Sequence, residues 1–443
     1  MEQKFIQNEN GVSRFPLEDL SAIMMDLHYK TGNNMNIALG IRFQGKLNPE
    51  KLEKAIQRLY DCNDAFRMMF YQTETGYEYS ILNEYTYHLE IIETEGDTEE
   101  ARFADAKAKI DADAQNPIDL LHELGVRFRC FRIGEKDHII YVNAHHVIFD
   151  SASLFLTIQE LITNYMTPGV FQRSVGQKNN LLQYYQDMDE LKRTKGEYYH
   201  GYWGKEIAGY ERQAVTPPEK KLNADSQLLF HISLPKAKLE KTARKMKVSP
   251  FGLMMAAYHL GLDTVFQRKD TVVGFSFVER TDPKYKDTIG PLVVASPNRI
   301  TFDPEEGALD FICRVTNKIY ENMKYAAYIP IETQITAQFM VSYANTGNMG
   351  EGGGITPVIP YVKRKYDDCL MLDINNTRNT IEFDVQCDLT LYQRDEVARI
   401  IDITRRFLED EHLMENLPLR SYTGEENGDW IETTKCYDNR GFR

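Results

Sequence analysis

The sequence predicts an α/β protein built from two lobes of similar size. The chain has 443 residues, which is more than a single small hydrophobic core organises. Amphipathic helical patterns and short apolar strand patterns are mixed in both halves of the chain. Two polar stretches without a clear pattern, 167–180 and 210–226, lie near its middle. We therefore expect an N-terminal lobe at 1–178, a C-terminal lobe at 179–420 and a polar tail at 421–443.

The first half alternates between helix and strand patterns. Asn48 and Pro49 mark a helix start, because asparagine suits the N-cap and proline suits the first turn. Alternating apolar residues from 37 to 43 are typical of a strand. Helices are expected at 21–29, 52–60, 98–114 and 154–165, and strands at 37–43, 67–72, 125–133 and 138–144.

The second half also alternates between helix and strand patterns, but its sequence does not repeat that of the first half. A polar helical stretch ends at Tyr202 and Trp203, and Ser249 with Pro250 opens an apolar helix as another N-cap pair. Helices are expected at 236–246, 251–266, 309–323 and 394–408, strands at 230–234, 271–278, 338–344 and 381–387, and an extended apolar run at 289–300.

Charge and composition argue against several classes of protein. The net charge of −14 disfavours a general nucleic-acid binder, which needs a basic surface. No segment has the roughly 20 consecutive apolar residues of a membrane span. The six cysteines have no CxxC spacing, which disfavours a zinc site or a disulfide framework. Without a signal-peptide pattern, the sequence favours a cytoplasmic protein that binds neither nucleic acid nor membrane.

The most informative stretch lies where the expected strand 138–144 meets the helix at 154–165. Two histidines, His145 and His146, are adjacent there, and Asp150 follows after three apolar residues. Successive side chains on a strand point to opposite faces, so the two imidazoles are poorly placed to share one metal ion. Asp150 suits the N-cap of the helix. The pattern fits a catalytic corner, and it also fits a buried histidine, an exposed histidine and a capping aspartate without chemistry.

With this order of elements, the chain resembles the condensation domains of nonribosomal peptide synthetases, which belong to the chloramphenicol-acetyltransferase-like superfamily. Residues 145–151 match the HHxxxDG motif of the family, except that Ser151 replaces the glycine. Val294 and Ala295 replace an asparagine and a threonine of another motif. Looser matches, in the order of the family, are 62–70, 117–120, Tyr202 with Trp203, 273–280 and 289–299.

The resemblance implies a fold and a set of site residues. The fold would be two chloramphenicol-acetyltransferase-like lobes in a V shape with an active-site tunnel between them. His146 would accept a proton from the nucleophile or hold it by a hydrogen bond, while His145 and Asp150 would shape the catalytic corner. Asp150 would pair with Arg280 from the second lobe. The residues expected to contact the substrate or its pantetheine arm are Ser151, Val294 and Ser296.

The expected function is that of a free-standing condensation enzyme, an acyltransferase of natural-product biosynthesis. The resemblance implies transfer of an acyl or aminoacyl group from the phosphopantetheine thioester of a carrier protein to an amine or a hydroxyl, which forms an amide or an ester. The acceptor would be a small molecule or would sit on a second carrier protein. We expect a monomer with no metal and no permanently bound cofactor. Two alternatives stay open: a coenzyme A-dependent acyltransferase of the same superfamily, and a non-catalytic recruitment module of a synthetase.

Overall fold

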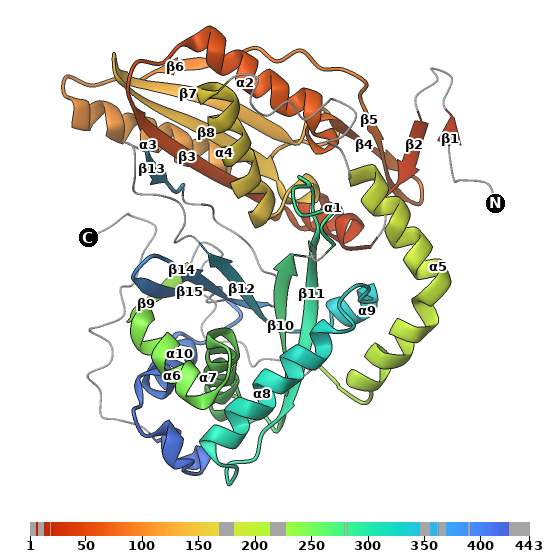
Figure 1. Cartoon of the computed structure of the whole chain (residues 1–443), viewed down its shortest axis with the longest axis vertical. Coiled ribbons are helices and arrows are strands. Elements are labelled where there is room, and N and C mark those ends of the chain that lie inside the picture. The colour runs from red at the N-terminus through yellow and green to blue at the C-terminus, as the bar shows by residue number, and fades with distance from the viewer. Residues whose placement is uncertain are drawn as a thin grey trace. The chain divides into compact units, whose positions relative to one another are not determined.

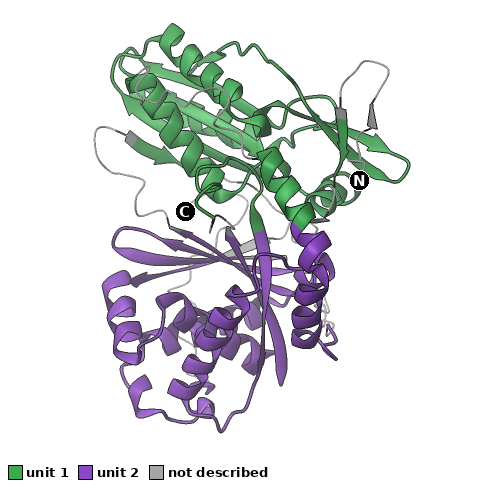
Figure 2. Ribbon diagram, turned by 45° about the vertical axis from the view of Figure 1, so that its right-hand side comes forward, with its two compact units in different colours: residues 1–190, 278–293, 349–365 green, residues 191–277, 294–348, 366–443 purple. Residues whose placement is uncertain are grey.

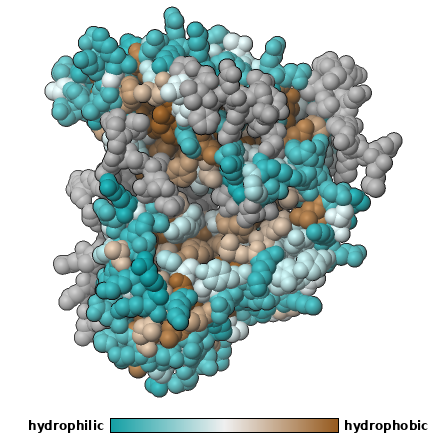
Figure 3. Space-filling model, in the orientation of Figure 1, coloured by the Kyte–Doolittle hydropathy of each residue, from teal (hydrophilic) through white to brown (hydrophobic). Residues whose placement is uncertain are grey.

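The computed structural model describes most of the chain. The described residues are 6–7, 13–17, 19–167, 181–212, 227–278, 280, 282–345, 355–360, 362, 369–388 and 390–424. Helices and strands are mixed throughout these ranges (Figure 1), which confirms the predicted α/β class. On the face shown in Figure 3, hydrophilic residues cover much of the coloured surface. Within the described residues, no helix is both long enough and apolar enough to cross a membrane.

The chain divides into two compact units (Figure 2). Unit 1 consists of residues 1–190, 278–293 and 349–365, and unit 2 consists of residues 191–277, 294–348 and 366–443. These bounds differ from the expected division after residue 178. The difference arises because two segments of the second half pack with the first unit, and because one continuous helix, α5 (Leu181–Glu206), contains the first boundary.

Unit 1 contains a five-stranded sheet with a hydrophobic core on each face. Its strand order is β13 (Ile355–Val358), β3 (Asn36–Gln44), β8 (Asp137–His145), β7 (Val126–Gly134) and β6 (Ile91–Glu93), with only the β6–β7 pair parallel among these. Two helices, α2 (Pro49–Cys62) and α4 (Ser151–Met166), contribute to the core on one face. The other face packs against α3 (Glu99–Gln115).

Unit 1 also contains the helix α1 (Asp19–Thr31) and a smaller, four-stranded sheet. The order of this sheet is β1 (Ile6–Gln7), β2 (Ser13–Pro16), β5 (Gly76–Ile81) and β4 (Met68–Thr73). A short 3-10 turn, η1 (Asp64–Arg67), leads into β4, and a second one, η2 (His146–Ile148), follows β8. The helix α1 contacts η2, so it lies next to the end of the histidine-bearing strand.

Unit 2 is a six-stranded sheet packed against helices. Its strand order is β11 (Val293–Thr301), β10 (Asp270–Val278), β12 (Phe339–Asn345), β14 (Leu370–Asn376), β15 (Thr380–Asp388) and β9 (Gln227–Pro235). The core is shared with the helices α6 (Lys236–Met246), α7 (Pro250–Val265), α8 (Ala308–Met323) and α10 (Arg394–Glu409). A single turn, α9 (Ile331–Gln334), precedes β12. Every residue of α7 from Gly252 to Asp263 is buried, which explains its nearly continuous apolar sequence.

Both predicted N-cap pairs are confirmed. The side chain of Asn48 accepts a hydrogen bond from the backbone N–H of Lys51, and Ser249 accepts one from Gly252. The expected tail begins later than residue 421. The turn η4 (Leu419–Tyr422) ends with a buried Tyr422 that packs on Phe407, with ring centroids 5.0 Å apart. Residues 425–443 of the expected tail lie outside the described residues.

Candidate active site

The histidine corner of unit 1 joins β8, the turn η2 and the helix α4. His145 is the last residue of β8, His146 begins η2, and Asp150 is the N-cap of α4. The side chains of His145 and Asp150 are 0% and 1% exposed. His146 is only partly buried, although the residues on both sides of it are buried. Of the three ionisable side chains of the corner, the imidazole of His146 is therefore the one that is not fully buried.

His145 holds the turn that carries His146. Its Nδ1 accepts a hydrogen bond from the backbone N–H of Val147 at 3.0 Å, so the ring caps η2. Its Nε2 lies 3.2 Å from Nδ1 of His28 on α1. Burial lowers the pKa of His145 well below its ordinary value, and the imidazoles of His28 and His146 act in the same direction. His145 is therefore a neutral, structural imidazole at neutral pH.

The backbone of His146 is fixed from a second side. Its N–H donates to the carbonyl oxygen of Met35 at 2.9 Å, just before β3 begins. The N–H of His145 donates to the carbonyl oxygen of Gly125 at 2.8 Å, just before β7 begins. The neighbours of β8 on both sides thus anchor the peptide groups at which the strand ends. This anchoring limits the positions that the imidazole of His146 can take.

Asp150 and Arg280 form a buried ion pair. Arg280 Nη1 lies 2.9 Å from Asp150 Oδ2, and Nη2 lies 3.1 Å from Oδ1. Both carboxylate oxygens have a further donor, because the N–H of Ser153 donates to Oδ1 at 2.7 Å and the N–H of Leu292 donates to Oδ2 at 3.0 Å. The pair was expected to join two lobes. It lies instead within unit 1, because the segment 278–293 packs there.

Ser153 completes this contact and was not identified from the sequence. Its buried hydroxyl donates to the carbonyl oxygen of Gly290 at 2.8 Å and accepts from the N–H of the same residue at 3.0 Å. The guanidinium of Arg280 also donates to the carbonyl oxygen of Thr288 at 2.8 Å. The first turn of α4 and the segment 282–292 are therefore bound to each other by side chains and backbone together.

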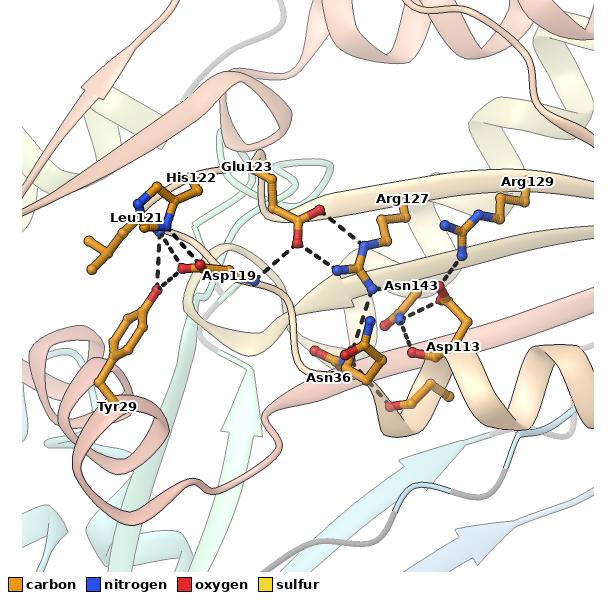
Figure 4. Close-up of polar contacts among 12 residues, drawn as sticks. Tyr29, Asn36, Asp113, Asp119, Leu121, His122, Glu123, Arg127, Arg129 and Asn143 are labelled. Atoms are coloured by element: carbon orange, nitrogen blue, oxygen red, sulfur yellow. Dashed lines mark hydrogen bonds and ion pairs between the residues drawn. The ribbon is translucent and has the colours of Figure 1, made fainter.

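A polar network supports the corner from the side of α3 (Figure 4). Asp113, near the end of α3, accepts a hydrogen bond from Asn143 of β8 at 2.9 Å, as Figure 4 shows. It accepts another from the hydroxyl of Tyr141, also at 2.9 Å. The same carboxylate forms ion pairs with Arg127 and Arg129 of β7. Side chains of β8 alternate between faces, so Asn143 lies on the same face of the sheet as the last residue of the strand. The network therefore fixes β8 close to the histidines.

The other expected site residues lie in two places. Ser151 is the first residue of α4 and is exposed, and its backbone is helical, so it needs no glycine there. Val294 and Ser296 belong to unit 2, where they lie on β11. Val294 is partly buried and packs against a cluster around Trp203. Ser296 is fully buried, and no described residue forms a hydrogen bond with its hydroxyl.

His28 is a second residue that sequence reasoning missed. The pattern of α1 indicates a helix, but it does not show which residue of that helix meets a strand end 117 residues later. Across the described residues, no three side chains of His, Cys, Asp or Glu lie in an arrangement able to hold a metal ion.

Comparison with known proteins shows a match to a protein family. The family model described as "Condensation domain" matches residues 23–422. Cyclosporin synthetase of Tolypocladium inflatum is 22% identical over 332 residues, which are 69% of this chain and only 2% of that protein.

Two solved structures share the fold. The condensation domain of the Monacolin K polyketide synthase MokA has a TM-score of 0.76 at 15% identity, covering 92% of this chain and 99% of that one. A chain from the complex of the X-domain and OxyB from teicoplanin biosynthesis has a TM-score of 0.75 at 15% identity, covering 94% and 97%. At these identities the likeness concerns the fold.

Proposed function

Because the chain belongs to the condensation domain family, we propose that it transfers an acyl or aminoacyl group from a carrier-bound thioester to an amine or a hydroxyl. The thioester would be carried on the phosphopantetheine arm of a carrier protein, and the product would be an amide or an ester. The observation that carries the proposal is the partly buried His146, which lies between the buried and hydrogen-bonded side chains of His145 and Asp150.

The proposed reaction has a simple balance of bonds and protons. The nitrogen or oxygen of the acceptor attacks the thioester carbon, and the tetrahedral intermediate collapses with loss of the pantetheine thiolate. His146 accepts the proton that the nucleophile loses and can return it to the departing sulfur. Imidazole suits this role because it ordinarily titrates near neutral pH. Holding the acceptor close to the thioester carbon contributes further, since positioning converts a bimolecular step into a local one.

Asp150 has a supporting role in this proposal. It is buried, and four hydrogen bonds from Arg280, Ser153 and Leu292 occupy both of its oxygens. A carboxylate bound in this way is a poor general base, because accepting a proton would break contacts that hold the corner together. The expected role of Asp150 in shaping the corner is consistent with these contacts.

Turnover with defined donors tests the proposal. The full chain is mixed with acyl groups loaded on a carrier protein and with a panel of amines and alcohols, and the carrier is followed by intact mass. We expect loss of the acyl group only with a suitable acceptor, and at least a 100-fold slower reaction for His146→Ala. The matched control is His88→Ala, which changes an exposed histidine of the same unit. Equal rates for His146→Ala and the control would contradict the catalytic assignment.

A recruitment module is the second candidate. The replacements at Ser151, Val294 and Ala295 favour it, and so does the likeness to the X-domain that was solved in complex with OxyB. Stable binding of a partner protein without turnover of any donor would support this candidate. The same assay with acyl-coenzyme A as the donor tests the remaining alternative, a coenzyme A-dependent transferase. The expectation that the chain is free-standing stays a prediction.

A further inference from the structure

His28 lies directly behind the corner that carries His146. It is on α1, its side chain is 8% exposed, and its Nδ1 is 3.2 Å from Nε2 of His145. The two rings meet edge to face, with centroids 4.8 Å apart at 80°. This contact joins α1 to the end of β8 across 117 residues of sequence. It involves no residue of the sequence motifs other than His145.

The hydrogen bonds define where the protons of both rings lie. Nδ1 of His145 accepts from the N–H of Val147, so the proton of the neutral ring is on Nε2. Nε2–H of His145 must then donate to Nδ1 of His28. With Nδ1 as the acceptor, neutral His28 carries its proton on Nε2, and this N–H is the donor available for the hydrogen bond that His28 makes with the backbone of Asn33. Each ring thus has one donor and one acceptor, and each of these is used.

Charge on either ring would break this arrangement. Burial lowers the pKa of His28, whereas Asp119 and the hydrogen bond with the Asn33 backbone oppose this shift. Burial also lowers the pKa of His145. A second proton on His28 would face the N–H of His145, and a second proton on His145 would face the N–H of Val147. Two neutral rings are therefore the only state in which all three hydrogen bonds coexist.

Tyr29, the neighbour of His28 on α1, is held by hydrogen bonds that Figure 4 shows. The hydroxyl of Tyr29 donates to Oδ1 of Asp119 at 3.0 Å and accepts from the N–H of Leu121 at 3.1 Å. Asp119 also binds the ring of His122 at 2.7 Å. The end of α1 is thus attached to the segment 117–122, so His28 cannot easily follow a movement of His145.

We propose that His28 is a positioning residue for the acyl transfer: by accepting the hydrogen bond of His145, it fixes the ring that caps η2 and so fixes the place of His146. This inference rests on the proposed function only for its effect on the rate. The tautomer and the orientation of His145 follow from the hydrogen bonds alone. Without the acceptor at His28, the Nε2–H of His145 is buried and unbonded, which favours rotation of the ring or transfer of its proton to Nδ1. Either change removes the cap from the N–H of Val147.

Two variants separate hydrogen bonding from packing. His28→Asn places an amide oxygen near the former Nδ1, so it retains an acceptor for His145. His28→Leu retains a buried side chain of moderate size without an acceptor. We expect kcat to fall on the order of tenfold for His28→Leu, the effect of losing about one hydrogen bond, and to recover within about threefold for His28→Asn. The KM for the donor should change little in both. His88→Asn, at an exposed histidine of the same unit, is the control.

A measurement without turnover tests the inference independently. Nitrogen-15 spectra of histidine-labelled full chain distinguish the two neutral tautomers, and the chain has only 10 histidines. The signal assigned to His145 should show a protonated Nε2 in the native protein and in His28→Asn, and a changed proton distribution in His28→Leu.

The inference is overturned if His28→Leu leaves the His145 signal unchanged, or if both variants lose the same activity while folded by circular dichroism. If no donor is turned over by the native protein, the proposed function fails, and the spectra still decide the role of His28 in orienting His145.

Discussion

Replacing Asp150 with alanine should loosen one specific part of unit 1. The substitution removes the N-cap of α4, which costs about 1 kcal/mol. It also leaves the guanidinium of Arg280, whose side chain is 9% exposed, without its carboxylate, and such a change costs about 3–5 kcal/mol. Arg280 keeps acceptors on Thr288, Gly290 and Ser153. We therefore expect the lower end of that range, about 3–4 kcal/mol in total.

Hydrogen exchange followed by mass spectrometry is the suitable assay for this effect. Fluorescence of Trp203 reports on unit 2, whereas Asp150 lies in unit 1. Amides of 151–156 and 284–292 should exchange faster in Asp150→Ala, by on the order of 100-fold for 3 kcal/mol, whereas those of β14 and β15 should keep their rates. Both segments belong to the contact that the carboxylate holds, which is why their protection should fall together.

A control in the same segment sets the scale. Asp187 pairs with Lys284, and these side chains are 31% and 48% exposed. Asp187 also accepts a hydrogen bond from the hydroxyl of Tyr285, so Asp187→Ala should cost about 1–2 kcal/mol. If Asp150→Ala and Asp187→Ala raise exchange in 284–292 equally, the buried ion pair does not stabilise the segment more than the exposed one. Unchanged protection in Asp150→Ala would refute the reasoning outright.

Two further predictions concern stability. Burial raises the pKa of Asp263 from 3.8 to about 8 in the folded chain, so this group stabilises unit 2 fully below about pH 4 and loses that contribution as the pH rises to about 8. Asp263→Asn should remove this pH dependence and be more stable than the native protein at pH 8 by up to several kcal/mol. Urea unfolding followed by Trp203 fluorescence in a Trp430→Phe background measures both proteins. If their stabilities change in parallel from pH 5 to 9, the prediction is wrong. Ser151→Gly should lower stability by less than about 1 kcal/mol, because Ser151 is an exposed first residue of α4; a larger loss in urea unfolding would show that the side chain has contacts beyond this position.

Local patterns in the sequence predict much of the fold and part of the site. N-caps at Asn48 and Ser249 need only neighbouring residues, so the sequence shows them directly. The strand β14 was missed although Leu370, Leu372 and Ile374 recur at every second position, with Asp373 and Asn375 as polar alternates in its second half. That omission was avoidable, because alternation is a local signal.

Other features depend on contacts that no local pattern encodes. The strand β13 joins the sheet of unit 1 from more than 300 residues away, by pairing Ile355 with Phe43. His28 meets His145 because of where α1 lies, and any residue on that side of the helix has the same periodicity. The division into units differs from the expected one for the same reason. The segment 278–293 packs with unit 1 through hydrogen bonds with Ser153 and Asp150 and through Tyr285, Ile289 and Leu292 in its core, and these are contacts between distant parts of the chain.

The path of the chain has a consequence for how the protein forms during synthesis. The sheet of unit 1 lacks one of its outer strands until the ribosome has made Val358, because β13 supplies it. Until then β3 presents unpaired backbone groups along an open edge, which is a template for wrong pairing between chains. Gly40 of β3 marks the closeness of the final fit, since a Cβ there would lie 3.1 Å from Cβ of Val358. The five-stranded sheet of unit 1 therefore stays incomplete until most of the chain has been translated. A chaperone that shields β3 in that interval would raise the yield of folded protein.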